Sequence, residues 1–352
     1  MLLLAVLFPL LAFASPVFHA RHGHGVSLPL SSRVVHQFPS HTWLENIVAR
    51  STGDLLVTAL IPTAAIYQIS DPTSDYSSIS LIANFTTVNG LLGITETKPD
   101  VFVVVGGNFT SPGVQVNGTF SAWEVDLSGS SQHRHHHHHN SKHDVSPRLI
   151  TALKPAAFLN GLGSLPQNPT AVLISDSALG VVWRLDTVTG KFNKALDFPE
   201  MKVAPGSPLA IGVNGLRIKN DTLYFTNSFE RAIYSVRVDG DGSVTPGGGV
   251  KKVVEIKEAA FLDDIAIGED GTIWACENVG NRLWSVTPSG TYATVLGGVN
   301  ETTVAGDTAA AFGRGNSDGK TLYVVTSGAL AAPVNGTYVE GGKVVAVDTS
   351  GY

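Results

Sequence analysis

Hydrophobic residues along this chain alternate with polar residues over short stretches and rarely recur at helical spacing. The stretches are rich in Val, Ile, Leu and aromatic residues, and they end at Gly, Asp, Asn or Pro. Residues 263–290, "DDIAIGEDGTIWACENVGNRLWSVTPSG", show the pattern as three apolar runs separated by Glu-Asp-Gly and Val-Gly-Asn. This segment predicts a β-meander.

Similar units recur along the chain, and most open with a small polar residue before an apolar run. Aligned on their first predicted strands, they open at Glu45, Asn89, Asn160, Asn214, Asp263 and Thr308. Apart from the interval between Asn89 and Asn160, the spacings are close to the roughly 45 to 50 residues of a four-stranded blade. The sequence therefore predicts an all-β fold, a six-bladed β-propeller over residues 34–352.

Two further segments fit this prediction. Residues 33–40, "RVVHQFPS", have strand character without a meander of their own, so we expect them to close the ring beside residues 342–348, "GKVVAVD". The long interval contains residues 128–147, a His-rich polar run that lacks apolar alternation. We interpret it as a surface loop inserted into one blade. A histidine run of this kind also binds transition metals adventitiously, without defined geometry.

The N-terminus predicts entry into the secretory pathway. Residues 1–14 form an apolar run that is too short to span a membrane and ends in Ala-Phe-Ala, which is typical of a cleaved signal peptide. An uncleaved anchor is the alternative interpretation. Residues 15–33 are expected to be a flexible N-terminus. Six glycosylation sequons support a lumenal or extracellular location, and they lie at Asn84, Asn108, Asn117, Asn220, Asn300 and Asn335.

Composition narrows the functional classes. The 352 residues are 43% hydrophobic and carry a net charge of -6, without a run of Lys and Arg interleaved with aromatics. We therefore expect no nucleic-acid partner, and no membrane partner after signal cleavage. Cys276 is the one cysteine, so no intramolecular disulfide can form. Its apolar neighbours predict a buried structural thiol.

In a propeller the first strand of each blade lines the axis, so the opening residues should converge at one end. Glu45, Asn160, Asn214 and Asp263 would present carboxylate and amide oxygens there. Such donors suit Ca²⁺, Mg²⁺ or Mn²⁺ and also hold Zn²⁺. The alternative is that these residues only cap strands and form turns.

The ordered set of "WLENI", "LNGLGSL", "VNGLRI" and "LDDIAIGEDG" resembles the gluconolactonase and senescence-marker-protein superfamily of six-bladed propellers over nearly the whole chain. The resemblance implies that Glu45, Asn214 and Asp263 are ligands of a divalent cation. It places Asn160 at the family's additional substrate-side asparagine.

The chain departs from the family's sugar-lactone hydrolases in blade three. Phe158 stands where those enzymes have an Arg, and Gly161 where they have an Asp. A phenyl ring cannot bind a polyhydroxylated acid as a guanidinium does, so the change favours an apolar ligand. Trp43, Phe158 and Phe261, each two residues before an opening position, are predicted to form an apolar rim, with packing between blades as the alternative.

The leader, "HTWLENI" and the apolar substitutions resemble the fungal branch of the superfamily that accompanies secondary-metabolite pathways. That branch includes the hetero-Diels-Alderases of tropolone sesquiterpenoid biosynthesis. The resemblance implies a pericyclase that joins an ortho-quinone methide to a humulene-type alkene, with no cofactor required. Asn160, Asn214 or a cation held by Glu45 and Asp263 would polarise the quinone methide oxygen, and the aromatic rim would bind the reactants.

Two alternatives remain at this point. One is a metal-dependent lactonase or esterase, in which Glu45, Asn214 and Asp263 hold the cation and Asp263 assists proton transfer. The other is a binding propeller without enzymatic activity, because the fold alone fixes no function. In each case we expect a monomer that takes a small molecule.

Overall fold

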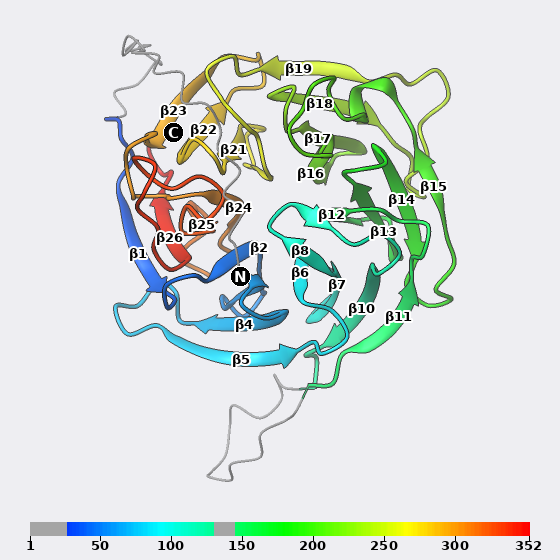
Figure 1. Cartoon of the computed structure of the whole chain (residues 1–352), viewed down its shortest axis with the longest axis horizontal. Coiled ribbons are helices and arrows are strands. Elements are labelled where there is room, and N and C mark those ends of the chain that lie inside the picture. The colour runs from blue at the N-terminus through cyan, green and yellow to red at the C-terminus, as the bar shows by residue number, and fades with distance from the viewer. Residues whose placement is uncertain (1–26, 130–144) are drawn as a thin grey trace.

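A computed structural model describes residues 27–129 and 145–352. Six four-stranded antiparallel sheets are arranged radially around a central axis, with β2, β6, β12, β16 and β24 near the centre (Figure 1). The sequence-based prediction of a six-bladed β-propeller is confirmed. In the described ranges the only helical element is the 3-10 helix η2 (Pro199–Met201), and no helix there is long and apolar enough to cross a membrane.

The first three blades use strands in chain order from the axis outward. Blade 1 contains β2 (Trp43–Ala49), β3 (Leu55–Ile61), β4 (Ala65–Ser70) and β5 (Ser78–Asn84). Blade 2 contains β6 (Gly90–Lys98), β7 (Val101–Gly107), β10 (Ser121–Asp126) and β11 (Arg148–Ala152), with the small hairpin β8 (Phe109–Ser111) and β9 (Val114–Gln115) inserted after β7. Blade 3 contains β12 (Leu159–Leu165), β13 (Asn168–Asp176), β14 (Val181–Asp186) and β15 (Phe192–Leu196).

The last three blades complete the ring. Blade 4 contains β16 (Val213–Lys219), β17 (Thr222–Asn227), β18 (Ala232–Arg237) and β19 (Lys251–Glu255). Blade 5 contains β20 (Ile265–Ile267), β21 (Ile273–Glu277), β22 (Arg282–Val286) and β23 (Tyr292–Gly297). Blade 6 contains β24 (Asp307–Phe312), β25 (Thr321–Thr326), β26 (Lys343–Asp348) and β1 (Ser32–Gln37).

The N-terminal strand closes the ring as the sequence predicts. β1 pairs with β26 in antiparallel register, with Arg33 opposite Ala346 and Val34 opposite Val345. Leu30, which precedes the predicted start of the propeller at residue 34, is buried, and its backbone N–H donates to the carbonyl of Val295. Of the predicted His-rich loop, residues 130–144 lie outside the described residues, as do the signal peptide and most of the predicted flexible N-terminus; the described flanks connect β10 to β11.

The innermost strands approach one another so closely that glycine is needed at their contacts. A Cβ on Gly161 would lie 2.5 Å from the carbonyl oxygen of Asn214 in the next blade. Gly93 and Gly215 meet the following inner strand in the same way, at Asn160 and Asp264. Two copies of the repeated Asn-Gly-Leu therefore owe their glycine to this contact, because any side chain would separate the blades.

Buried hydroxyl groups join these inner strands. Ser175 Oγ accepts from the backbone N–H of Gly161 in its own blade and donates to the carbonyl of Asn214, at 2.5 Å, in the next. Thr226 makes the matching pair of bonds with Gly215 and with the carbonyl of Asp263. Each hydroxyl satisfies backbone groups that the irregular register at the start of the inner strand leaves unpaired.

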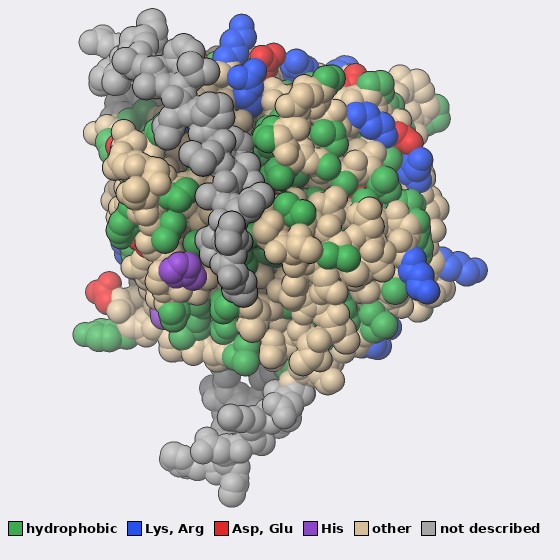
Figure 2. All heavy atoms as spheres, in the orientation of Figure 1, with side chains coloured by type: hydrophobic (Ala, Val, Ile, Leu, Met, Phe, Trp, Pro, Cys, Tyr) green, Lys and Arg blue, Asp and Glu red, His purple; other side chains and the backbone are tan. Residues whose placement is uncertain are grey.

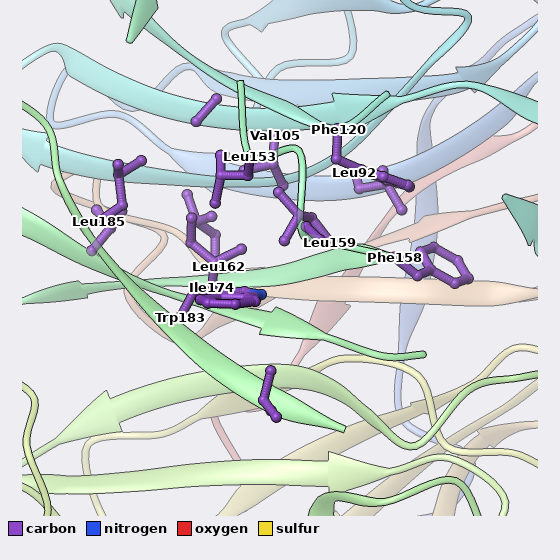
Figure 3. Close-up of a cluster of buried hydrophobic side chains, with 14 of the residues drawn as sticks. Leu92, Val105, Phe120, Leu153, Phe158, Leu159, Leu162, Ile174, Trp183 and Leu185 are labelled. Carbon is purple, nitrogen blue, oxygen red and sulfur yellow. The ribbon is translucent and has the colours of Figure 1, made fainter. Parts of the chain in front are cut away.

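Hydrophobic side chains fill the spaces between adjacent blades. One such cluster packs blades 2 and 3 together, and Figure 3 shows Phe158 at one end of it, apart from Trp183 and Leu185. Cys276 belongs to the cluster between blades 5 and 6 and is fully buried. Burial raises the pKa of its thiol well above the usual range, so Cys276 is a packing residue, as expected.

The close approach of the inner strands predicts the effect of Gly161→Ala. The added methyl group meets backbone atoms of β16 that cannot move independently, so unfolding by urea should show a loss of about 1 to 3 kcal/mol. Gly249→Ala is the matched control, since nothing lies within 4 Å of its added Cβ. Equal stability of the two variants would contradict the packing account.

Candidate functional site

The candidate site lies at the end of the propeller where the inner strands begin, which we call the amino-terminal face. Antiparallel order places the turn between the second and third strands of each blade at this same face. All six opening residues predicted from the sequence lie within two residues of the start of an inner strand. Outside the grey atoms, Figure 2 shows Lys and Arg gathered toward the periphery of the visible face.

Glu45 is a buried carboxylate held by a tryptophan. The indole N–H of Trp43 donates to its Oε2 at 2.5 Å, and both side chains are buried in β2. Burial raises the pKa of Glu45 well above its usual range, and the carboxylates of Asp263 and Asp264 raise it further. Trp43, predicted from the sequence as part of an apolar rim, therefore orients Glu45 through its indole N–H.

Asn214 and Asp263 belong to a hydrogen-bonded chain across three blades. The Asn214 amide Nδ2 donates to Ser228 Oγ at 3.0 Å and to Asp263 Oδ1 at 2.9 Å. Asn278 Nδ2 donates to Asp263 Oδ2, and Ser327 Oγ donates to Asn278 Oδ1. We call these five residues the axial chain. Burial raises the pKa of Asp263 to about 7, although both amide donors oppose the rise.

A second polar layer supports the axial chain. Asp264 follows Asp263, and its Oδ2 accepts from Asn46 Nδ2 at 3.0 Å and from Arg217 Nη2 at 2.6 Å. Asn46, Asp264 and Arg217 come from blades 1, 5 and 4, so this layer connects strands on different sides of the axis. Arg217 thus gives this buried carboxylate a partner of opposite charge, and Asn46 gives it a further donor.

Asn160 has the matching position in blade 3 but a different environment. Asn160 is 6% exposed in β12. Its side-chain amide makes no hydrogen bond to any other residue that the structure describes. Both Asn214 N–H groups are already occupied. Of the two asparagines, Asn160 is therefore the one with N–H groups available to a ligand.

The aromatic residues predicted for the rim lie in one apolar cluster. Phe158 and Phe261 are buried in it, and half-buried side chains from four further segments extend it over the amino-terminal face; these are Phe109, Leu209, Phe229 and Val279. The Phe158 ring lies 5.5 Å from that of Phe109, and the Phe261 ring lies 5.1 Å from that of Phe229. Phe158 and Phe261 themselves pack mainly against protein.

A repeated acidic residue holds the segment that carries each buried phenylalanine. Asp176 accepts from the backbone N–H of Phe158 and from the indole of Trp183. Glu277 accepts in the same way from Ala260, next to Phe261, and from Trp284. In the sequence this arrangement is visible only as an acidic residue followed seven residues later by Trp, a pattern that occurs in both blades and was not recognised as a signal.

The structure also permits a test of the implied cation site. Within the described ranges, no group of three or more His, Cys, Asp or Glu side chains is arranged to hold a metal ion. A cation would need Glu45, Asp263 and the Oδ1 of Asn214, and this amide oxygen is buried without a hydrogen-bond partner. Two repelling carboxylates beside an unpaired amide oxygen fit a divalent cation with oxygen ligands.

Comparisons with known proteins agree with this architecture. Residues 208–328 match the family described as the SMP-30/gluconolactonase/LRE-like region. A curated protein from Sarocladium schorii, provisionally assigned as a hetero-Diels-Alderase, is 34% identical over 354 residues and covers 92% of this chain and 85% of its own. One from Phoma sp, with the same provisional assignment, is 32% identical over 330 residues, covering 87% and 89%. A solved luciferin-regenerating enzyme matches with a TM-score of 0.61 at 14% identity, covering 91% and 95%.

The raised pKa of Asp263 predicts how stability depends on pH. In metal-free buffer the unfolded chain ionises Asp263 near its ordinary value of 3.8, whereas the folded chain does so near 7. The stabilisation from the neutral form is thus complete below about pH 4 and lost as the pH rises to about 7, a change on the order of several kcal/mol. Urea unfolding at pH 5 and pH 8 should show a larger fall for the wild type than for Asp263→Asn. Parallel pH profiles would exclude this role for Asp263.

Proposed function

Since this chain belongs to the SMP-30/gluconolactonase-like family of six-bladed propellers, in the branch of the two fungal hetero-Diels-Alderases, we propose that it catalyses an intermolecular hetero-Diels-Alder cycloaddition. Membership of this branch identifies the chain as an enzyme of the cyclase type. The reactants we propose are a tropolone-type ortho-quinone methide and a humulene-type sesquiterpene. The reaction forms one C–O and one C–C bond and releases no leaving group, so it requires no nucleophile and no cofactor.

The observation that carries the proposal is the division of the amino-terminal face. Blades 2 and 3 contribute the rings of Phe109 and Phe158, which contact each other. Blades 1, 4 and 5 contribute Glu45, Asn214 and Asp263. A reactant with an apolar body and one reactive oxygen could lie across this boundary. Holding two apolar reactants in one orientation lowers the barrier by several kcal/mol.

Asn160 lies at the boundary and supplies the donor in this proposal. It comes two residues after Phe158, and its amide is free to donate to the oxygen of the heterodiene. A hydrogen bond there stabilises the negative charge that develops on the oxygen as the alkene adds. The other residues predicted from the sequence then have supporting roles: Asn214 and Asp263 form the axial chain, and Phe261 supports the apolar surface.

A metal-dependent lactonase is the second candidate function, supported by the unpaired Oδ1 of Asn214. Glu45, Asn214 and Asp263 would hold the cation, which when bound would polarise a lactone carbonyl. Asp263 would assist proton transfer from the attacking water. Phe158, at the position of the sugar-binding Arg in the family's lactone hydrolases, weighs against a sugar lactone.

One assay separates the two functions and tests Asn160. The purified enzyme is incubated with humulene and a precursor that releases the quinone methide, with and without EDTA, and the adduct is measured by chiral chromatography. We expect EDTA to have no effect and Asn160→Ala to lower kcat by about 100- to 1,000-fold, the effect of one lost donor. Asn193→Ala, on the exposed outer strand β15, is the matched control. Adduct no faster than background would reject the cycloaddition, and EDTA-sensitive lactone hydrolysis would favour the alternative.

We further propose that the protein is secreted as a glycosylated monomer. Support comes from the exposure of five sequon asparagines, with Asn108 half-buried; the exposed five are Asn84, Asn117, Asn220, Asn300 and Asn335. Expression through a secretory host should give protein whose mass falls after treatment with peptide N-glycosidase. Unchanged mass would contradict this location.

A further inference from the structure

The second blade uses its Asn-Gly-Leu differently from the others. Asn89 is exposed and does not join the axial chain. Its side-chain Nδ2 donates to the carbonyl of Phe109 at 2.9 Å, and its Oδ1 accepts from the N–H of Phe109 at 2.8 Å. Its own backbone N–H donates to Asn108 Oδ1 at 2.9 Å. One asparagine thus fixes both backbone polar groups of Phe109, as a neighbouring β-strand would.

Gly90 provides the space for the ring of Phe109. A Cβ on Gly90 would meet a methyl group of Leu60 and would lie 3.2 Å from two atoms of the Phe109 ring. The ring therefore lies over the start of β6, between blade 1 and blade 3. There it makes edge contacts with Phe120 and Phe158, with ring centroids 5.9 and 5.5 Å apart. We call these three residues the aromatic wall.

The hairpin that begins with Phe109 also reaches the segment before blade 4. Its turn residue Gly113 has φ +73°, and a Cβ there would lie 3.0 Å from Leu209 Cδ1. Leu209 and the neighbouring Ile211 belong to the same apolar cluster as the aromatic wall. The hairpin is therefore held at its base by Asn89 and packed at its tip against Leu209, which fixes Phe109 on the amino-terminal face.

We propose that Phe109 contacts the apolar reactant and determines which face of it meets the heterodiene, and that Asn89 is the residue that positions Phe109. This inference rests on the proposed cycloaddition, since it specifies how the alkene is bound. Phe109 is half-buried, whereas Phe158 and Phe120 are buried behind it. Of the aromatic wall, Phe109 is thus the member with the most surface available to a ligand.

The test compares Phe109→Ala and Asn89→Ala with Phe192→Ala. Phe192 packs on the same apolar cluster but lies on the outer strand β15, so its loss controls for general destabilisation. We expect both test variants to raise KM for humulene by about tenfold, as expected for one lost aromatic contact, and to change the ratio of adduct stereoisomers. Asn89→Asp keeps the acceptor for the Phe109 N–H and should restore part of the selectivity.

Humulene binding alone, followed by quenching of tryptophan fluorescence, separates the two proposals. If the wild type forms adduct but Phe109→Ala keeps the wild-type KM and isomer ratio, the role of Phe109 is refuted and the cycloaddition stands. If the wild type forms no adduct, the cycloaddition fails. In that case, humulene binding that is weakened by Phe109→Ala but unchanged by Phe192→Ala would still support a contact between Phe109 and humulene. Equal binding by the two variants, or no binding by the wild type, would overturn that contact.

Discussion

The close approach of the inner strands around the axis is the constraint on which the rest of the structure depends. Gly161 lies against the backbone of Asn214, and Gly215 lies against Asp264. Hydroxyl groups such as Ser175 Oγ then join the carbonyl of one strand to the N–H of another. Side chains at the starts of these strands have little freedom, so polar groups from different blades must meet and be satisfied together.

This constraint explains the electrostatics of the amino-terminal face. Burial raises the pKa of both Glu45 and Asp263, and the carboxylate of Asp263 raises that of Glu45 further. Hydrogen bonds offset part of the cost of burying these carboxylates. The Trp43 indole donates to Glu45, and the amides of Asn214 and Asn278 donate to Asp263. The protein therefore keeps preorganised polar groups at the axis. Burying them lowers its stability, and the large hydrophobic core between the blades offsets this loss.

Blade 2 uses its Asn-Gly-Leu differently from blades 3 and 4. This difference divides the amino-terminal face into an aromatic half and a polar half. Where the other Asn-Gly-Leu units direct an asparagine into the buried inner layer, blade 2 uses Asn89 and Gly90 to hold the ring of Phe109. The repeat thus supplies the scaffold, and differences between repeats create the chemistry. A sugar-binding arginine would not fit behind Phe109, because Phe158 there is packed among aromatic rings.

Much of the fold could be predicted from the sequence because blade spacing and strand alternation are local signals. The closure of the ring by residues 33–40 and the burial of Cys276 followed from the same signals. The partners of individual side chains could not be predicted. The hydrogen bond from the Trp43 indole to Glu45, two residues along the same strand, is one example.

Phe109 carried no sequence signal, because its place depends on a hairpin that folds back onto Asn89, twenty residues earlier. Asn278 and Ser327 carried no signal either, since Asn278 contacts Asp263 at the far end of a hairpin in its own blade and Ser327 contacts Asn278 from the next blade. Long-range contacts of this kind are set by the closed ring and not by any local pattern.

A crystal structure of the wild-type enzyme with its cycloadduct would show where the reaction takes place. We expect the adduct on the amino-terminal face, with its former quinone methide oxygen within hydrogen-bonding distance of Asn160 Nδ2 and its hydrocarbon ring against Phe109. An adduct bound at the opposite end, beside Arg217 and Lys219, or one with its oxygen directed away from the polar half, would contradict this expectation.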